Sequence, residues 1–293
     1  MSAASRRRAV LVLPYAWLVL FFLVPFLIAL KISLAHSVIA IPPYSSLVES
    51  VPGGDWRLAL TGESYRRLVG DDLYLIAYLN AVKFAGISTL CCLLLGYPLA
   101  YGIVRAPRRW RNLLLLLVIL PFWTSFLIRV YAWIGLLKEN GLINDALLAL
   151  GLVHQPLILL NNAFAVYVGI VYSYLPFMVL PLYAQLEKLD PALLEAAADL
   201  GCRPWQAFLR VTLPLSLPGV AAGALLVFIP AVGEFVIPDL LGGPNTLMIG
   251  KVLWDEFFAN HDWPMAASVA VAMLVLLLLP MALIRRLLQG ETA

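Results

Sequence analysis

Six long apolar stretches constrain the fold of this chain more than any other feature. A helix that crosses a bilayer needs about 20 consecutive, mostly apolar residues. The six predicted spans are residues 10–34, 76–104, 113–137, 163–186, 213–237 and 265–288. Charged residues make up 13% of the 293 residues, against roughly 25% in a typical soluble domain. We therefore expect an all-α, polytopic membrane protein with six transmembrane helices, built as one transmembrane domain over residues 1–293.

The distribution of Lys and Arg predicts the orientation of these spans. Short loops rich in Lys and Arg stay on the cytoplasmic side of a membrane. Here they flank the first and last spans and fill the second and fourth connections, whereas the other three connections hold mainly acids. The basic residues are Arg6, Arg7, Arg8, Arg105, Arg108, Arg109, Arg111, Lys188, Arg203, Arg210, Arg285 and Arg286. We expect both termini in the cytoplasm. The net charge of +3 reflects this asymmetry, and it gives no reason to expect a nucleic-acid partner.

A short polar segment between the fourth and fifth spans, residues 190–205, carries strong helix signals; we call it the polar corner. Asp190 can cap free backbone N–H groups, and Pro191 suits the first helical position. Gly201 can adopt the left-handed conformation that ends many helices. Glu195 and Asp199, four residues apart, present two carboxylates on one face. These features fit either a docking surface or an ordinary amphipathic connector lying on the lipid.

The spacing in the polar corner resembles the signature of permease subunits of binding-protein-dependent ABC importers. That signature is Glu-Ala-Ala, three residues, Gly, nine residues, and Ile-x-Leu-Pro. This chain has Glu195-Ala196-Ala197, then Gly201, then Val211-Thr212-Leu213-Pro214, with Val in place of Ile. The resemblance implies the type I importer permease fold, with residues 190–205 as a coupling helix that sits in a cleft of an ATPase subunit. It assigns ATPase coupling to a set of six residues: Asp190, Glu195, Ala196, Ala197, Asp199 and Gly201.

Other strings are similar to the permeases of polyamine importers, those for putrescine in particular. They are Leu13-Pro-Tyr-Ala-Trp17, Ile41-Pro-Pro-Tyr44, the stretches 121–133 and 229–238, and Pro176-Phe-Met-Val-Leu-Pro181. This resemblance implies a bacterial inner-membrane protein that works with two copies of a cytoplasmic ABC ATPase. It also implies a second permease subunit, similar or identical to this one, and a periplasmic polyamine-binding protein.

The chain lacks the residues that would bind ATP or perform catalysis. No Gly-x4-Gly-Lys-[Ser/Thr] loop is present: Gly250-Lys251 is followed by Val252, and Asn245 stands where the first Gly belongs. The histidines are widely separated, and the cysteines have no metal-ligand or disulfide spacing. We expect no catalytic site, no metal and no cofactor, with ATP bound by the partner ATPase.

An acid inside the fifth span is the first candidate for the substrate path. Glu234 lies between Pro230 and Pro238, and ionisable residues within spans usually face cavities or partners. A carboxylate and aromatic faces could replace the water around a diamine. The aromatic candidates are Trp123, Tyr131, Tyr172 and Tyr174. The alternative is that Glu234 makes a hydrogen bond or ion pair at a helix end, with Arg129 as a candidate partner.

Three other functions remain to be distinguished. Spermidine or another small solute could replace putrescine as the substrate. An ATP-independent secondary transporter would also place an acid within six spans, but it would show inverted repeats, and no convincing internal copy exists. An intramembrane enzyme would group a nucleophile with a base, and no motif in the sequence does so.

Overall fold

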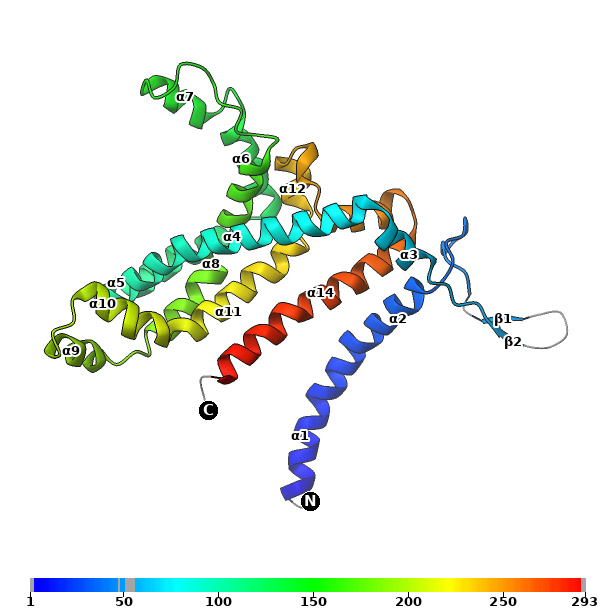
Figure 1. Cartoon of the computed structure of the whole chain (residues 1–293), viewed down its shortest axis with the longest axis horizontal. Coiled ribbons are helices and arrows are strands. Elements are labelled where there is room, and N and C mark those ends of the chain that lie inside the picture. The colour runs from blue at the N-terminus through cyan, green and yellow to red at the C-terminus, as the bar shows by residue number, and fades with distance from the viewer. Residues whose placement is uncertain (1–2, 47, 51–55, 291–293) are drawn as a thin grey trace. The chain divides into compact units, whose positions relative to one another are not determined.

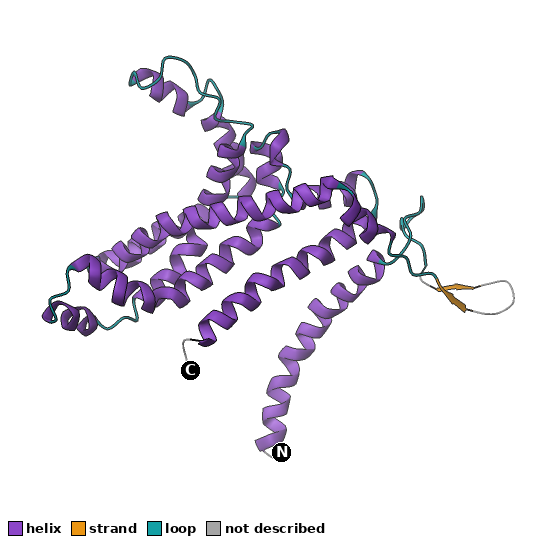
Figure 2. Ribbon diagram, in the orientation of Figure 1, coloured by secondary structure: helices purple, strands orange, loops and turns teal. Residues whose placement is uncertain are grey.

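The computed structural model describes residues 3–46, 48–50 and 56–290, and nearly all of them are helical (Figure 1, Figure 2). The strands in this part of the chain are β1 (Val48–Ser50) and β2 (Trp56–Leu58), a short antiparallel pair between the first two spans. The predicted fold class is confirmed: the chain is an all-helical, polytopic membrane protein with one small hairpin.

Fourteen α-helices and five short π or 3₁₀ segments make up the described chain. The α-helices are α1 (Ala3–Leu18), α2 (Val24–Ser33), α3 (Glu63–Gly70), α4 (Asp72–Arg105), α5 (Arg108–Ile119), α6 (Phe126–Leu137), α7 (Leu142–Ala149), α8 (Ala163–Leu186), α9 (Pro191–Asp199), α10 (Pro204–Ala207), α11 (Leu213–Val232), α12 (Val236–Leu241), α13 (Ile249–Trp254) and α14 (Trp263–Gly290). The π segments are η1 (Val19–Leu23), η3 (Phe208–Thr212) and η5 (Asp255–Ala259), and the 3₁₀ segments are η2 (Leu120–Trp123) and η4 (Pro244–Thr246).

Five helical segments among the described residues are long and apolar enough to cross a bilayer. They are Leu11–Ser33, Asp72–Arg105, Ala163–Leu186, Pro204–Val232 and Trp263–Ala282. Each overlaps one of the predicted spans. The fifth predicted span, 213–237, extends past the end of its helix, because α11 ends at Val232 and the short α12 begins only at Val236.

The predicted span 113–137 is not one straight helix. α5 continues through η2 to Trp123, and α6 begins at Phe126 after a bend of 91°. At the bend, Thr124 and Ser125 have extended backbone, with ψ angles of 151° and 138°. Pro121 within η2 has no N–H to continue the helical ladder. The two pieces make a sixth span if they cross the membrane as one broken helix.

The chain divides into two compact units. Unit 1 consists of Met1–Leu75 with Val252–Leu276, and unit 2 of Ile76–Lys251 with Leu277–Ala293. Within unit 1, the Leu11–Ser33 segment buries none of its most apolar stretch. The sequence explains this exposure: nearly every side chain from Leu11 to Leu30 is apolar, as expected for a helix surrounded by lipid or by another subunit.

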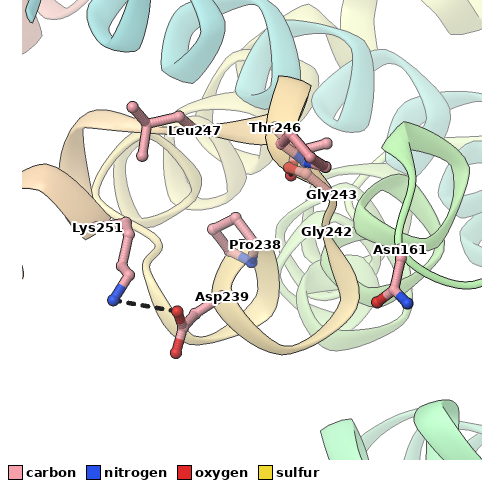
Figure 3. A pocket seen from close by; sticks show the side chains of 9 residues that line it. Asn161, Pro238, Asp239, Gly242, Gly243, Thr246, Leu247 and Lys251 are labelled. Carbon is pink, nitrogen blue, oxygen red and sulfur yellow. Dashed lines mark hydrogen bonds and ion pairs between the residues drawn. The ribbon is translucent and has the colours of Figure 1, made fainter. Parts of the chain in front are cut away.

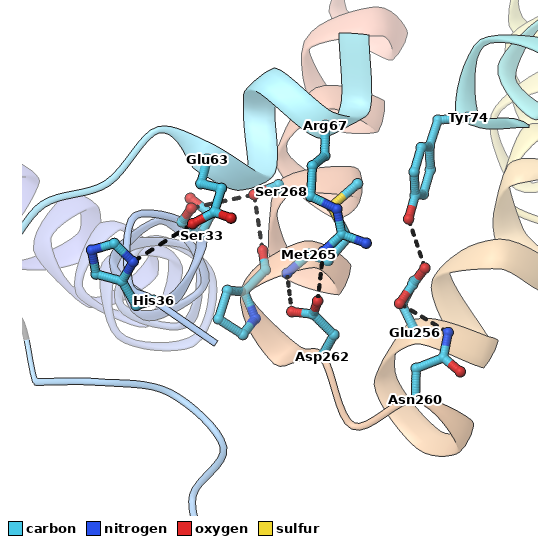
Figure 4. A network of polar contacts seen from close by, with 11 residues as sticks. Ser33, His36, Glu63, Arg67, Tyr74, Glu256, Asn260, Asp262, Met265 and Ser268 are labelled. Carbon is cyan, nitrogen blue, oxygen red and sulfur yellow. Dashed lines mark hydrogen bonds and ion pairs between the residues drawn. The ribbon is translucent and has the colours of Figure 1, made fainter. Parts of the chain in front are cut away.

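Polar contacts hold the other elements of unit 1 together (Figure 4). Arg67 of α3 pairs with Asp262 at 3.2 Å. Tyr74 donates to Glu256 Oε1 at 2.7 Å, and Asn260 Nδ2 donates to Glu256 Oε2 at 3.1 Å. Glu256 is only 8% exposed, so it is a structural acceptor.

The core of unit 2 is built on the close packing of α8 against α11. A Cβ on Gly223 would lie 2.7 Å from Met178 Sδ, and one on Gly219 would lie 2.7 Å from Gln185 Cβ. Small residues at such positions let two membrane helices approach closely. α4 adds its own buried side chains, and Tyr97 of α4 shares a 2.8 Å hydrogen bond with Ser216 of α11. Figure 1 shows α9 and α10 at one end of the α8–α11 pair and α12 at the other.

Candidate functional site

A buried carboxylate lies at the break between α11 and α12. Glu234 is 7% exposed, and its Oε1 accepts the backbone N–H groups of Phe235, Val236 and Ile237 at 3.1, 3.0 and 3.3 Å. Its other oxygen, Oε2, accepts the hydroxyl of Tyr174 from α8 at 2.5 Å. Glu234 therefore caps α12 and ties this helix to α8. The hydrogen bond at a helix end, one of the two alternatives for this residue, is therefore present.

Arg129 of α6 lies at the same place without pairing with Glu234. Its Nη1 donates to the Pro121 carbonyl at 2.9 Å, and its guanidinium lies 5.3 and 5.7 Å from the ring centres of Phe122 and Phe126. The side chain is largely buried, and Nε has no hydrogen-bond partner among the described residues. Among the described residues, no ion pair joins Arg129 to Glu234, so the candidate pair is not formed in this structure.

These two charged residues border a cavity of about 400 Å³. Its walls come from the η2–α6 bend, from α8 and from the α11–α12 break: Phe122, Phe126, Arg129, Ser173, Tyr174, Phe177, Pro230, Gly233, Glu234, Phe235 and Val236. We call it the Glu234 cavity. One carboxylate and one guanidinium give it a formal charge of zero, and four phenylalanines are among its lining residues.

Only one of the four predicted aromatics lines the Glu234 cavity, and that residue is Tyr174. Trp123 and Tyr131 are 78% and 58% exposed and lie outside it. Tyr172 also lies outside and packs edge-on against Trp133, with ring centres 5.4 Å apart. Neighbouring positions on the α8 helix point in different directions. Tyr172 and Tyr174 are two residues apart, which explains why they do not share a surface.

The phenylalanines of the Glu234 cavity were missed because they come from three separate segments: the η2–α6 bend, α8 and the α11–α12 break. Phe122 and Phe126 flank the 91° bend, and Phe177 lies three residues after Tyr174 on α8. A signal was nevertheless present. Phe126 and Arg129 have i, i+3 spacing, as do Tyr174 and Phe177, and residues with that spacing share a helix face.

Glycine permits the tight packing behind the break. A Cβ on Gly250 of α13 would overlap the carbonyl oxygen of Gly233. Gly250 thus has a packing role. The dipeptide Gly250-Lys251 matches only part of a phosphate-binding loop.

The polar corner has the local structure that its sequence predicts. The Asp190 side chain accepts the Ala192 N–H at 3.0 Å, and α9 begins at Pro191. After α9 ends, Gly201 has φ = +80° and donates to the Ala198 carbonyl at 2.9 Å. A Cβ at Gly201 would have open space around it, so only the backbone conformation favours glycine there. Both predicted features, the cap and the left-handed stop, are confirmed.

The outward surface of α9 is polar and small. Glu195, Ala196 and Asp199 are exposed, whereas Ala197 is 7% exposed and faces its own chain, where α9 packs on η3. Ala197 therefore supports the corner from within. Beyond α9, Leu200 and Trp205 are exposed apolar side chains, at 86% and 58%. The spacing of the signature residues in the sequence could not show which alanines of α9 are exposed and which are buried.

A second cavity, of about 490 Å³, lies near the glycine-rich turn that follows α12 (Figure 3). Asp239 and Lys251 form an ion pair across it at 3.1 Å. Gly242 and Gly243 approach Pro238, Thr246 and Asn161 so closely that added Cβ atoms would overlap their neighbours. This turn is a rigidly packed element. Among the described residues, no group of three or more His, Cys, Asp or Glu side chains could hold a metal ion.

Comparisons with known proteins place this architecture in a family. The model of the family described as "Binding-protein-dependent transport system inner membrane component" matches residues 92–291. The spermidine/putrescine transport system permease protein PotB of Haemophilus influenzae is 40% identical over 265 residues, covering 90% of this chain and 88% of that protein. PotB of Escherichia coli K12 is 43% identical over 221 residues, covering 75% and 80%.

A solved structure with a similar fold is the bacterial alginate ABC transporter in complex with an alginate pentasaccharide-bound periplasmic protein. Its matching chain has a TM-score of 0.68 and 19% identity, covering 96% of this chain and 94% of that one. The predicted family, derived from the spacing of the polar corner, is confirmed. This chain belongs to the binding-protein-dependent family of ABC transporter permeases, which are multi-pass proteins of the inner membrane.

Proposed function

We propose that this chain is a permease subunit of an ATP-driven polyamine importer, with putrescine as the first candidate substrate. Its single transmembrane domain would provide part of the path across the inner membrane, with both termini in the cytoplasm. Two relatives that match most of its length carry spermidine and putrescine in their names, and this likeness supports a polyamine over other solutes. Spermidine is the main alternative.

The observation that carries the substrate-path proposal is the Glu234 cavity itself. Phenylalanine faces attract cations, and the attraction of a cation to a ring is about 0.5–2 kcal/mol depending on how far it is desolvated. Glu234 supplies the one negative charge in the lining, and Arg129 offsets it. A cavity of zero formal charge would hold a dication weakly. Weak binding suits a path that has to release its substrate, while capture from dilute solution falls to a periplasmic binding protein.

The energy for transport would enter at the polar corner. We propose that the outward face of α9, with Glu195, Ala196 and Asp199, docks on an ABC ATPase, and that Asp190 and Gly201 fix the ends of that helix. The complete importer would contain two ATPase copies, a second and similar permease, and a periplasmic polyamine-binding protein. ATP would bind to the ATPase alone.

Reconstitution of the complete complex tests this function. ATPase activity is measured with putrescine, spermidine, an uncharged diol of matched length and no addition, each in the presence of the binding protein. Stimulation by the two amines and none by the diol is the expected result. Equal stimulation by the diol would contradict a polyamine substrate, and uptake by the purified chain alone without ATP would favour a secondary transporter.

A further inference from the structure

A cavity of about 420 Å³ lies in unit 2 directly beside the polar corner. The ends of α4 and α8, the first turn of α5 and the start of α9 all contribute to it. Three guanidinium groups border it, those of Arg105, Arg108 and Arg111, and the side chains of Leu186 and Leu194 are part of its apolar wall. We call it the arginine cavity. Apart from Asp190, the lining residues have no proposed role in the substrate path or in ATPase docking.

Two of the three arginines are oriented by contacts with neighbouring groups. Arg111 Nε donates to the Ala106 carbonyl at 2.9 Å, and the Arg105 guanidinium lies 4.5 Å from the ring centre of Tyr101. Arg108 makes no ion pair among the described residues and is exposed at the start of α5. Held guanidinium groups lose little conformational freedom when they bind an oxyanion, and their planar donors match phosphate oxygens.

The carboxylates at this cavity are already engaged. Glu187 accepts the Tyr183 hydroxyl at 2.7 Å, and its Oε1 lies 3.8 Å from Arg111 Nη1. Asp190 accepts the Ala192 N–H as the cap of α9. With three arginines and these two acids, the formal charge of the lining is 3 − 2 = +1. The cavity therefore keeps a net attraction for anions.

A buried hydroxyl provides a second and independent indication of a ligand. Thr212 is 2% exposed and lines the arginine cavity, and its Oγ1 has no hydrogen-bond partner among the described residues. Buried polar groups in proteins nearly always have a partner, and a missing one points to an absent water, ion or ligand. Oγ1 itself is shielded from solvent, so a phosphate oxygen in the cavity would become that partner after the Thr212 side chain rotates about χ1.

We propose that the arginine cavity binds the phosphate group of an anionic phospholipid from the cytoplasmic leaflet. Basic pockets between membrane helices on the cytoplasmic side are suited to anionic headgroups. The apolar wall beside the basic rim favours a lipid over free phosphate, because a lipid brings acyl chains as well as charge. Asp190 and Leu194 belong both to this lining and to the polar corner, so a bound headgroup would brace the helix proposed to meet the ATPase.

Lipid retention by the purified full-chain complex tests this site independently of any transported substrate. Native mass spectrometry counts phosphatidylglycerol molecules retained from mixed micelles with phosphatidylcholine. The variants are Arg108→Gln and Thr212→Val, and the matched control is Arg109→Gln. Arg109 is the next residue along α5 and does not line the cavity; its guanidinium lies 5.9 Å from the Trp110 ring centre.

We expect Arg108→Gln to weaken phosphatidylglycerol retention about five-fold, the effect of one basic residue near an anionic headgroup. Thr212→Val should weaken it too while leaving the melting temperature of the complex unchanged or higher, because it removes an unpartnered buried hydroxyl. Arg109→Gln should retain the lipid like the unmodified chain.

Equal losses in the Arg108 and Arg109 variants would overturn the site, since a diffuse basic surface would then be responsible. Displacement of the retained phosphatidylglycerol from the mixed micelles by millimolar inorganic phosphate would overturn the lipid assignment in favour of the free ion. Retention that no variant alters would also overturn the proposal. None of these outcomes depends on whether the transported solute is a polyamine, so a failure here is distinct from a failure of the proposed function.

Discussion

Replacing Glu234 with glutamine changes the charge of the Glu234 cavity while nearly preserving its shape. In the unmodified chain, Glu234 Oε1 accepts three backbone N–H groups at the start of α12. The carbonyl oxygen of glutamine can accept the same three groups. The negative charge disappears, so the formal charge of the lining rises from zero to +1 through Arg129. The acceptor for the Tyr174 hydroxyl disappears as well, because the amide NH2 that replaces Oε2 cannot accept a hydrogen bond. A dication entering the cavity would then meet net repulsion.

The size of this effect follows from Coulomb's law. A unit charge about 6 Å from a substrate ammonium, at an effective dielectric constant of about 20, contributes about 3 kcal/mol. Water that enters an open cavity screens part of this, and halving the value leaves about 1.5 kcal/mol, or roughly a ten-fold rise in KM. The hydrogen bonds also weaken, because bonds to charged groups contribute about 1.5–3 kcal/mol against about 0.5–1.5 for neutral ones.

The assay is uptake of labelled putrescine and spermidine by vesicles containing the complete complex, with KM and maximal rate measured separately. Tyr174→Phe is the matched control: it removes the hydroxyl that donates to Glu234 at 2.5 Å but leaves both charges in place. A charge effect raises KM about ten-fold in Glu234→Gln and only slightly in Tyr174→Phe. Assembly is checked by the amount of complex that co-purifies with the ATPase.

Two results would refute this reasoning. Unchanged KM in a normally assembled Glu234→Gln complex would show that the carboxylate does not influence the substrate. Equal losses in Glu234→Gln and Tyr174→Phe would show that the link between α8 and α12 matters and that the charge does not.

Three further predictions concern single residues. Arg129→Gln should lower the KM for a dication several-fold, opposite in sign to the Glu234 change, and an unchanged or raised KM in uptake assays would contradict the charge balance. Gly201→Val should reduce substrate-stimulated ATPase activity because its left-handed backbone costs about 1–2 kcal/mol, whereas Gly201→Asn should retain most of it; equal activity would argue against a role of this stop in coupling. Gly250→Ala should destabilise the chain by about 1–3 kcal/mol in thermal unfolding through overlap with Gly233, while Gly102→Ala, which meets open space, should not; similar melting temperatures would contradict the overlap.

The regular parts of the fold were predictable because they depend on patterns within one segment. The apolar stretch 163–186 coincides with α8, and its internal prolines Pro176 and Pro181 leave the helix continuous. The polar corner was predictable for the same reason, since Asp190 and Gly201 act through their own and adjacent backbone groups.

The parts that escaped prediction depend on contacts between distant segments. Hydropathy does not distinguish Pro121, which lies where the third span bends, from prolines that helices tolerate. Glu256 reads as a solvated loop acid, yet its burial depends on Tyr74, 182 residues away. Glu234 and Tyr174 were both named as candidates from the sequence, but the hydrogen bond between them and the neighbouring Phe177 depend on how α8 packs against the α11–α12 break.

The glycine contacts between α8 and α11 limit how this permease can move. The close contacts of Gly219 and Gly223 with α8 resist sliding of one helix along the other, so α8 and α11 should move together as one rigid unit. Twenty residues of α11 extend about 30 Å. One end of α11 leads to the polar corner and the other to the Glu234 break, where Tyr174 from the middle of α8 donates to Glu234. A small tilt imposed at the polar corner would thus be transmitted along α11 to the walls of the Glu234 cavity, the proposed substrate path.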